Sequence, residues 1–181
     1  MKTLDKKKAL GVISGVAVAG VLLGQLAAVA EGERSDRSRT RELARLKQVT
    51  AAYHNDALAI AGEYEATDQC VASEQGGMGY HYAKVEWIDE FIDQNQPEAL
   101  LYAPAEKGTR KLTGIEYVKV DADQNVNTDD DRPSLFGQPF DGPMPGHEPG
   151  MPVHYDLHVW VWRTNPQGVF AQWNPRVTCP T

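Results

Sequence analysis

The 181-residue sequence has only two cysteines, an excess of acidic over basic side chains and no motif for an activated nucleophile. Cys70 and Cys179 lie too far apart to match the spacing of a zinc-binding pair. No serine stands in a Gly-x-Ser-x-Gly setting, so nucleophilic serine catalysis has little support. With 18 basic and 25 acidic side chains the net charge is −7, which disfavours nucleic acid as a partner.

The first thirty residues have the features of an export signal. Four lysines in the first eight residues precede an uncharged run of about 22 residues, which ends in Ala28-Val29-Ala30. A membrane-spanning helix needs about 20 apolar residues, so the run is also long enough for an anchor. We predict a signal peptide at residues 1–30, with an uncleaved anchor as the alternative and the only expected membrane contact. Either reading places the rest of the chain outside the cytoplasm, as a secreted or cell-envelope protein.

The remaining chain fits one domain that follows a short tether. Without residues 1–30 it has 14 basic and 24 acidic side chains, and a net charge of −10. Residues 31–40 lack apolar positions and are expected to form a charged tether, while residues 41–181 are long enough for a single core. In an oxidising compartment Cys70 and Cys179 are predicted to form a disulfide, the alternatives being free thiols or a metal pair.

Patterns of apolar residues predict an α+β fold. Between Leu43 and Tyr64 they recur at three- and four-residue steps, which indicates an amphipathic helix. Six of the eleven prolines lie in residues 133–152, which predicts a long, stiff Pro/Gly-rich loop. We expect the helix to pack on a small, mainly antiparallel sheet. The other elements that we predict are a glycine loop at 74–79, a short strand at 80–82, a brief helix at 85–93, a hairpin of 99–102 with 112–120, and a strand at 153–163.

The last predicted strand has two different faces. β-Branched and aromatic residues favour an extended conformation there, and side chains alternate between the two sides of a strand. The side predicted to face the core contains Val153, Tyr155, Leu157, Val159 and Val161. The opposite side contains His154, Asp156, His158, Trp160 and Trp162, so it is polar at one end and aromatic at the other.

The polar end of this strand is the best candidate for a functional site. Imidazoles with nearby carboxylates favour a divalent transition metal such as zinc or copper. Residues four apart on a strand are separated by about 13 Å, so one ion needs neighbouring residues of this strand and ligands from elsewhere. The candidate ligands are His81, Glu116, His147, His154, Asp156 and His158.

Other uses of the same face remain open. The histidines and Asp156 would also fit a structural polar cluster on a solvated sheet, or a metal-independent hydrolase or lyase with a His/Asp acid–base pair. Trp160 and Trp162 would fit a non-catalytic envelope module that binds its ligand on aromatic rings. Whether the protein is an enzyme is not decided by these residues.

Three stretches resemble motifs of a known family. GGMGYHY, FDGPMPGHEPGMPVHYDLHVWVW and FAQWNPRVTC are similar to segments of a family of uncharacterised secreted bacterial proteins. The resemblance runs from about Leu46 to Cys179. It implies export and a single domain, and it implies no activity and no site residue.

Overall fold

The computed structural model describes the backbone of residues 16–180 and the side chains of residues 28–180. The chain divides into two units between Arg37 and Ser38. The basic start of the predicted signal peptide lies outside the described residues, whereas residues 16–30 of its apolar run are helical. Among the described residues, no helix is both long and apolar enough to cross a membrane.

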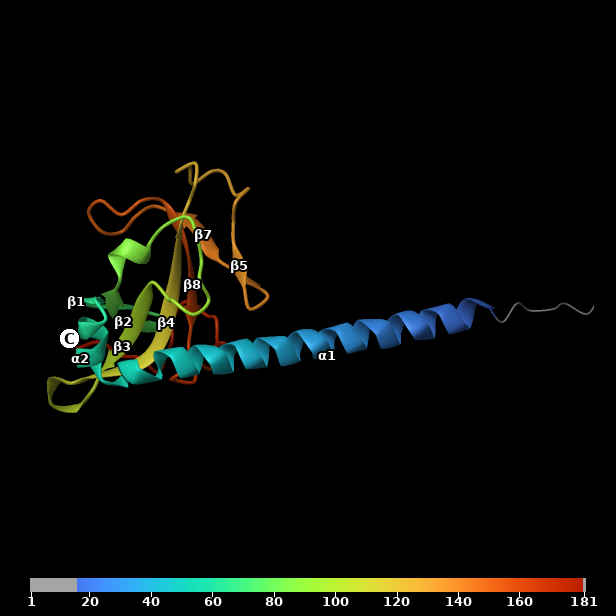
Figure 1. Ribbon diagram of the computed structural model, residues 1–181, viewed down its shortest axis with the longest axis horizontal. Coiled ribbons are helices and arrows are strands. Elements are labelled where there is room, and N and C mark those ends of the chain that lie inside the picture. The colour runs from blue at the N-terminus through green and yellow to red at the C-terminus, as the bar shows by residue number, and fades with distance from the viewer. Residues whose placement is uncertain (1–15, 181) are drawn as a thin grey trace, which may run out of the picture. The chain divides into compact units, whose positions relative to one another are not determined.

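The described elements are three helical segments, followed by strands with short turns of 3-10 helix between some of them (Figure 1). In chain order they are α1 (Val16–Thr50), η1 (Ala51–His54), α2 (Asp56–Ala61), β1 (Glu65–Ser73), β2 (Gly76–Ala83), η2 (Val85–Trp87), β3 (Ala99–Pro104), η3 (Glu106–Gly108), β4 (Arg110–Val120), β5 (Ser134–Leu135), β6 (Gln138–Pro139), β7 (Asp141–Met144) and β8 (His154–Val159). Strands β5 and β6 pair only with each other, and the other strands form one sheet.

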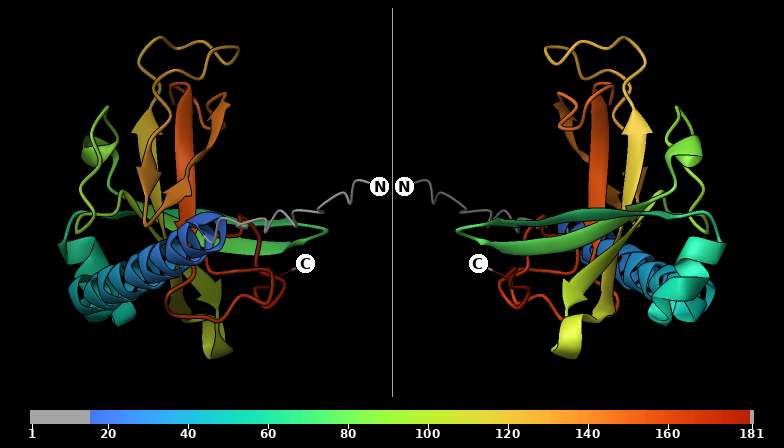
Figure 2. Two further views of the ribbon diagram at one scale, coloured as in Figure 1. Left: turned by 90° about the vertical axis from the view of Figure 1, so that its right-hand side faces the viewer. Right: turned by 90° about the vertical axis from the view of Figure 1, so that its left-hand side faces the viewer.

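Six strands form one antiparallel sheet in the order β1-β2-β3-β4-β8-β7. The sheet is strongly curled, so that β1 and β2 (green) run across the direction of β4 and β8 (Figure 2). Register shifts between β1 and β2 and between β3 and β4 accompany the curl, since bulges increase the local twist. The α+β fold with a mainly antiparallel sheet is therefore confirmed.

The C-terminal part of α1 covers one face of the sheet. Leu46 is fully buried, and Leu43 and Val49 pack beside it against the main core. The core-facing residues of β8 are Tyr155, Leu157 and Val159, which join this cluster as their alternation predicts. Burial of such side chains stabilises the fold by about 1.5–3 kcal/mol each, so the helix is held mainly by this contact.

The predicted helix at 43–64 is correct only in part. Helix α1 ends at Thr50, whose hydroxyl bonds back to the Leu46 carbonyl at 2.8 Å, and Asn55 then caps the separate helix α2. Ile60, predicted to lie on the apolar stripe, is about half exposed. The expected tether at 31–40 is exposed but helical, and Glu33 and Arg37 pair across one turn at 3.7 Å.

Two further predictions on local structure are wrong. The glycines expected in a loop at 74–79 lie in β2, where a Cβ at Gly77 would meet Val177 and one at Gly79 would meet the carbonyl of Tyr102. Glycine is thus needed for close packing on both sides of this strand. The helix expected at 85–93 is a single 3-10 turn. Apart from these two corrections, residues 133–152, where a Pro/Gly-rich loop is expected, contain the short strands β5, β6 and β7.

The C-terminal segment covers part of the second face of the sheet. Gly77 and Asn174 exchange backbone hydrogen bonds at 3.1 Å, and Val177 is buried with Leu101, Ala103 and Trp160 in a small second core. The predicted disulfide is present: Cys70 on β1 bonds to Cys179, with their Cα atoms 5.6 Å apart. The disulfide therefore anchors the end of the described chain to the sheet edge.

Candidate metal centre

The candidate site lies on the second face of the sheet and joins three strands. His158 on β8 is directly opposite Glu116 on β4, and directly opposite residues of an antiparallel pair point to the same side. His81 on β2 lies beyond β3, which pairs with both β2 and β4. The antiparallel pairing of β2, β3 and β4, together with the long connection from β4 to β8, thus brings three distant segments of the sequence together.

The three side chains converge closely enough to share an ion. One ligand atom from each of His81, Glu116 and His158 lies within 4.8 Å of the other two. The Glu116 carboxylate oxygens are 3.3 Å from His81 Nε2 and 3.7 Å from His158 Nε2. Ligands on a tetrahedral zinc ion are about 3.4 Å apart, so small side-chain rotations would complete the site.

Burial leaves polar atoms of this cluster without partners. His158 is fully buried and Glu116 is 5 % exposed, whereas His81 retains 18 % side-chain exposure and opens the cluster to solvent. Neither ring nitrogen of His158 has a hydrogen-bond partner among the described residues, and neither does Asp156 Oδ1. Such unsatisfied atoms cost free energy, and a bound ion would remove that cost.

The histidines are held in their neutral form. Burial lowers the pKa of His158 to about 3, and the nearby charges of His81 and His147 add to this effect. Burial lowers the pKa of His81 to about 4, again with a contribution from His147. A neutral imidazole is the form that binds a metal, so both rings are ready to act as ligands at neutral pH.

The neighbouring carboxyl groups shift in the opposite direction. Burial, followed by the charge of Asp156, raises the pKa of Glu116 well above its usual range. Burial, followed by the charge of Asp141, raises the pKa of Asp156 to about 7. Asp156 Oδ1 lies 3.9 Å from His158 Nδ1, the nitrogen that points away from the Glu116 contact, which is close enough for an electrostatic interaction but too long for a hydrogen bond.

The donor set fits a transition metal better than calcium or magnesium. Two imidazoles and one carboxylate suit zinc, copper or iron, whereas the larger hard cations require a cage of oxygen atoms. Three protein ligands also leave a position open for water or another molecule, as in catalytic zinc sites. The cluster can therefore hold a metal, and it can expose that metal to a ligand through the side of His81.

The structure divides the six predicted ligands into two groups. His81, Glu116 and His158 converge, with Asp156 beside them. His147, on the loop after β7, instead lies next to His154, with ring centroids 5.2 Å apart. The sequence prediction expected an ion to bind neighbouring residues of the last strand, whereas the carboxylate closest to His158 is that of Glu116 on the adjacent strand. The position of Glu116 between the apolar residues Ile115 and Tyr117 was the sequence feature that indicated its orientation.

The two tryptophans predicted to form a binding platform do not come together. Trp160 is buried in the second core and donates its indole N–H to the Ala171 carbonyl at 2.6 Å. Trp162 packs against the main core, where its N–H donates to Thr50 and its ring meets His54 edge-on. Both rings thus fill structural positions on different faces.

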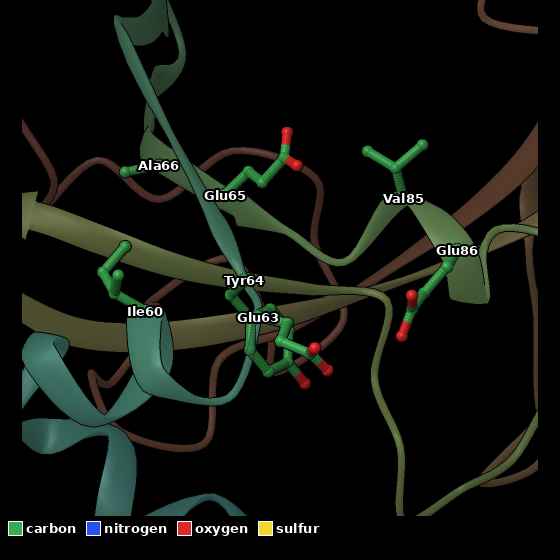
Figure 3. A pocket seen from close by; sticks show the side chains of 7 residues that line it. All are labelled: Ile60, Glu63, Tyr64, Glu65, Ala66, Val85 and Glu86. Atoms are coloured by element: carbon green, nitrogen blue, oxygen red, sulfur yellow. The ribbon is translucent and has the colours of Figure 1, made fainter.

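A shallow hollow of about 840 Å³ lies away from the histidines. Figure 3 shows it between α2, the start of β1 and η2, with carboxylates from Glu63, Glu65 and Glu86 around it. The ammonium group of Lys84 lies 3.1 Å from Glu63 and 3.3 Å from Glu86, so these two carboxylates already have a cation. The hollow therefore offers weaker grounds for a metal site than the buried cluster does.

Comparisons with protein-family models, with curated proteins and with solved structures give no match.

Proposed function

We propose that this protein is an exported metalloprotein that holds a divalent transition-metal ion through His81, Glu116 and His158. The observation that carries the proposal is the convergence of three ligand atoms within 4.8 Å at a buried point, where neither nitrogen of His158 has a hydrogen-bond partner among the described residues. A buried polar cluster without hydrogen bonds is costly, and an ion is the partner that this donor set fits.

Zinc is the metal that we expect under ordinary conditions. It accepts two imidazoles and one carboxylate in tetrahedral geometry, and the fourth position is then taken by water. An ion in this position lowers the pKa of its bound water, which is the basis of metal-dependent hydrolysis. Asp156, which lies beside His158, would keep that ring in the orientation that presents Nε2 to the ion.

Export is the second part of the proposal. The disulfide between Cys70 and Cys179 is typical of an oxidising compartment, and the basic and apolar N-terminal segment agrees with a signal sequence. Membership of a family of secreted bacterial proteins, which the three motifs suggest, is in keeping with this location.

The test is a metal titration of the purified protein. Zinc affinity is measured by competition with a chromophoric chelator, and the metal content after purification from the native compartment is measured by mass spectrometry. We expect one zinc ion per chain and a loss of affinity of about 100-fold or more in His158→Gln or Glu116→Gln, because each change removes a ligand.

His54→Gln is the matched control. His54 lies against Trp162 on the other side of the sheet, so its removal should leave zinc affinity unchanged. Unaltered affinity in both ligand variants would contradict the proposal. Absence of zinc, copper and iron binding at micromolar concentration would favour the alternative of a His/Asp acid–base pair, for which the adjacency of His158 and Asp156 is the supporting observation.

A further inference from the structure

We propose that His147 and His154, with the thioether of Met144, form a second metal site that prefers copper(I). This outer site is separate from the cluster of His81, Glu116 and His158, and it does not depend on a metal being bound there. It is built by β7, the start of β8 and the loop that joins them.

His154 is arranged as a metal ligand. It is fully buried, and its Nδ1 lies 3.0 Å from the Pro152 carbonyl oxygen, to which it can donate only as N–H. The other nitrogen, Nε2, then carries a free lone pair, and it has no hydrogen-bond partner among the described residues. A backbone carbonyl that fixes the ring in this way is a common feature of histidines that bind metals.

His147 lies at the right separation to share an ion with His154. An imidazole centroid is about 3.1 Å from a metal bound at about 2.0 Å, so two rings at a tetrahedral angle have centroids about 5 Å apart. The observed separation is 5.2 Å, with an angle of 64° between the rings. This spacing fits an ion between the rings, as well as direct edge-to-face packing.

The loop geometry keeps His147 in this position. A Cβ on Gly146 would collide with the Met151 carbonyl oxygen, so only glycine permits the chain to approach itself so closely here. The Met151 N–H also donates to the Glu148 carbonyl at 3.0 Å, which closes the turn. The exposed side chain of His147 therefore lies on a tight loop that constrains its position.

Met144 determines the preference for copper. It pairs directly with His154 across β7 and β8, and the Cβ atoms of such a pair are about 5 Å apart, which is within reach of a thioether. Its side chain is only partly buried. Thioether sulfur is a soft ligand that selects copper(I), whereas zinc prefers imidazole, carboxylate and thiolate.

The test is a pair of titrations under anaerobic conditions. Copper(I) affinity is measured against a chromophoric copper(I) chelator, and zinc affinity is measured on the same variants. We expect the protein to bind one copper(I) and one zinc ion together, and His147→Gln and Met144→Leu to weaken copper(I) binding about tenfold or more. Zinc affinity should stay within about twofold in both variants, and Glu116→Gln should show the reverse pattern.

Two control variants separate ligation from damage to the fold. His54→Gln and Met78→Leu remove an imidazole and a thioether at positions outside both sites, and should leave both affinities unchanged. Equal copper(I) affinity in His147→Gln and the unaltered protein would overturn the outer site. Loss of zinc affinity in His147→Gln, with competition between the two metals for one position, would show a single shared site and would also overturn it.

Discussion

The stability of the metal-free protein should fall as the pH rises from 6.5 to 8.5, and Glu98 should account for much of the fall. Glu98 is 2 % exposed, immediately before β3, and accepts a hydrogen bond from the Val118 N–H at 3.0 Å. Burial, with smaller contributions from Asp89 and Asp93, raises the pKa of Glu98 to about 8. The usual value of 4.5 applies in the unfolded chain, so between the two values only the folded state holds the proton.

The direction and size of the effect follow from this difference. Because the folded state binds more protons, its stability decreases with pH until Glu98 ionises. His81 and His158 act in the opposite direction below pH 6.5, where the unfolded histidines gain protons that the folded ones do not. At pH 6.5 the unfolded histidines are still half protonated, so they offset a small part of the fall until they are neutral at about pH 7.5. Between pH 6.5 and the Glu98 pKa of about 8 the Glu98 difference spans 1.5 pH units, which corresponds to about 2 kcal/mol.

Urea unfolding in the presence of a chelator tests this reasoning. Glu98→Gln keeps the shape and the acceptor oxygen but has no proton to lose, so its loss of stability between pH 6.5 and 8.5 should be about 2 kcal/mol smaller than that of the unaltered protein. Glu116 and Asp156 remain and leave a residual slope of the same sign. Equal slopes in the two proteins would refute the account.

Two other changes have defined expected effects. Replacing Cys70 and Cys179 together by serine opens a cross-link between positions 109 apart, and should lower stability by about 5 kcal/mol on the loop-entropy model, which calorimetry would detect as a fall in Tm of about 10–20 °C. An unchanged Tm would show that the C-terminal segment is held without the bond. Asp156→Asn should weaken zinc binding about 10- to 100-fold in a competition titration, and an affinity equal to that of the unaltered protein would exclude a role in orienting His158.

Local periodicity in the sequence was sufficient to predict β8 and its two faces as far as Val159, where the strand ends, and not as far as residue 163, so that Trp162 packs against the main core and not on the histidine side. The alternation of apolar and polar residues placed Tyr155, Leu157 and Val159 in the core and the histidines on the other side, as observed. The same reasoning put Glu116 on the polar side of β4. These predictions succeeded because each depends only on the period of a single strand.

The elements that could not be predicted depend on contacts between distant segments. Four consecutive residues of β2, from Gly76 to Gly79, contain three glycines, and they form a strand only because Asn174, Val177 and Tyr102 approach the backbone from both sides. Intrinsic propensity disfavours a strand there, and tertiary packing overrides it. The pairing of Glu116 with His158 likewise depends on the register between β4 and β8, which the sequence of neither strand contains.

The charge of the buried cluster gives a reason for the presence of Asp156. Without metal, burial favours neutral imidazoles and protonated carboxyl groups, so the cluster carries little charge. A divalent ion bound to two neutral histidines and an ionised Glu116 would leave one uncompensated positive charge in a buried place, which is costly. Ionised Asp156, 3.9 Å from His158, would balance that charge without occupying a position on the metal. The fourth position would then remain free for water or another ligand, and a buried aspartate without a hydrogen bond to Oδ1 would have a function in the metal-bound state.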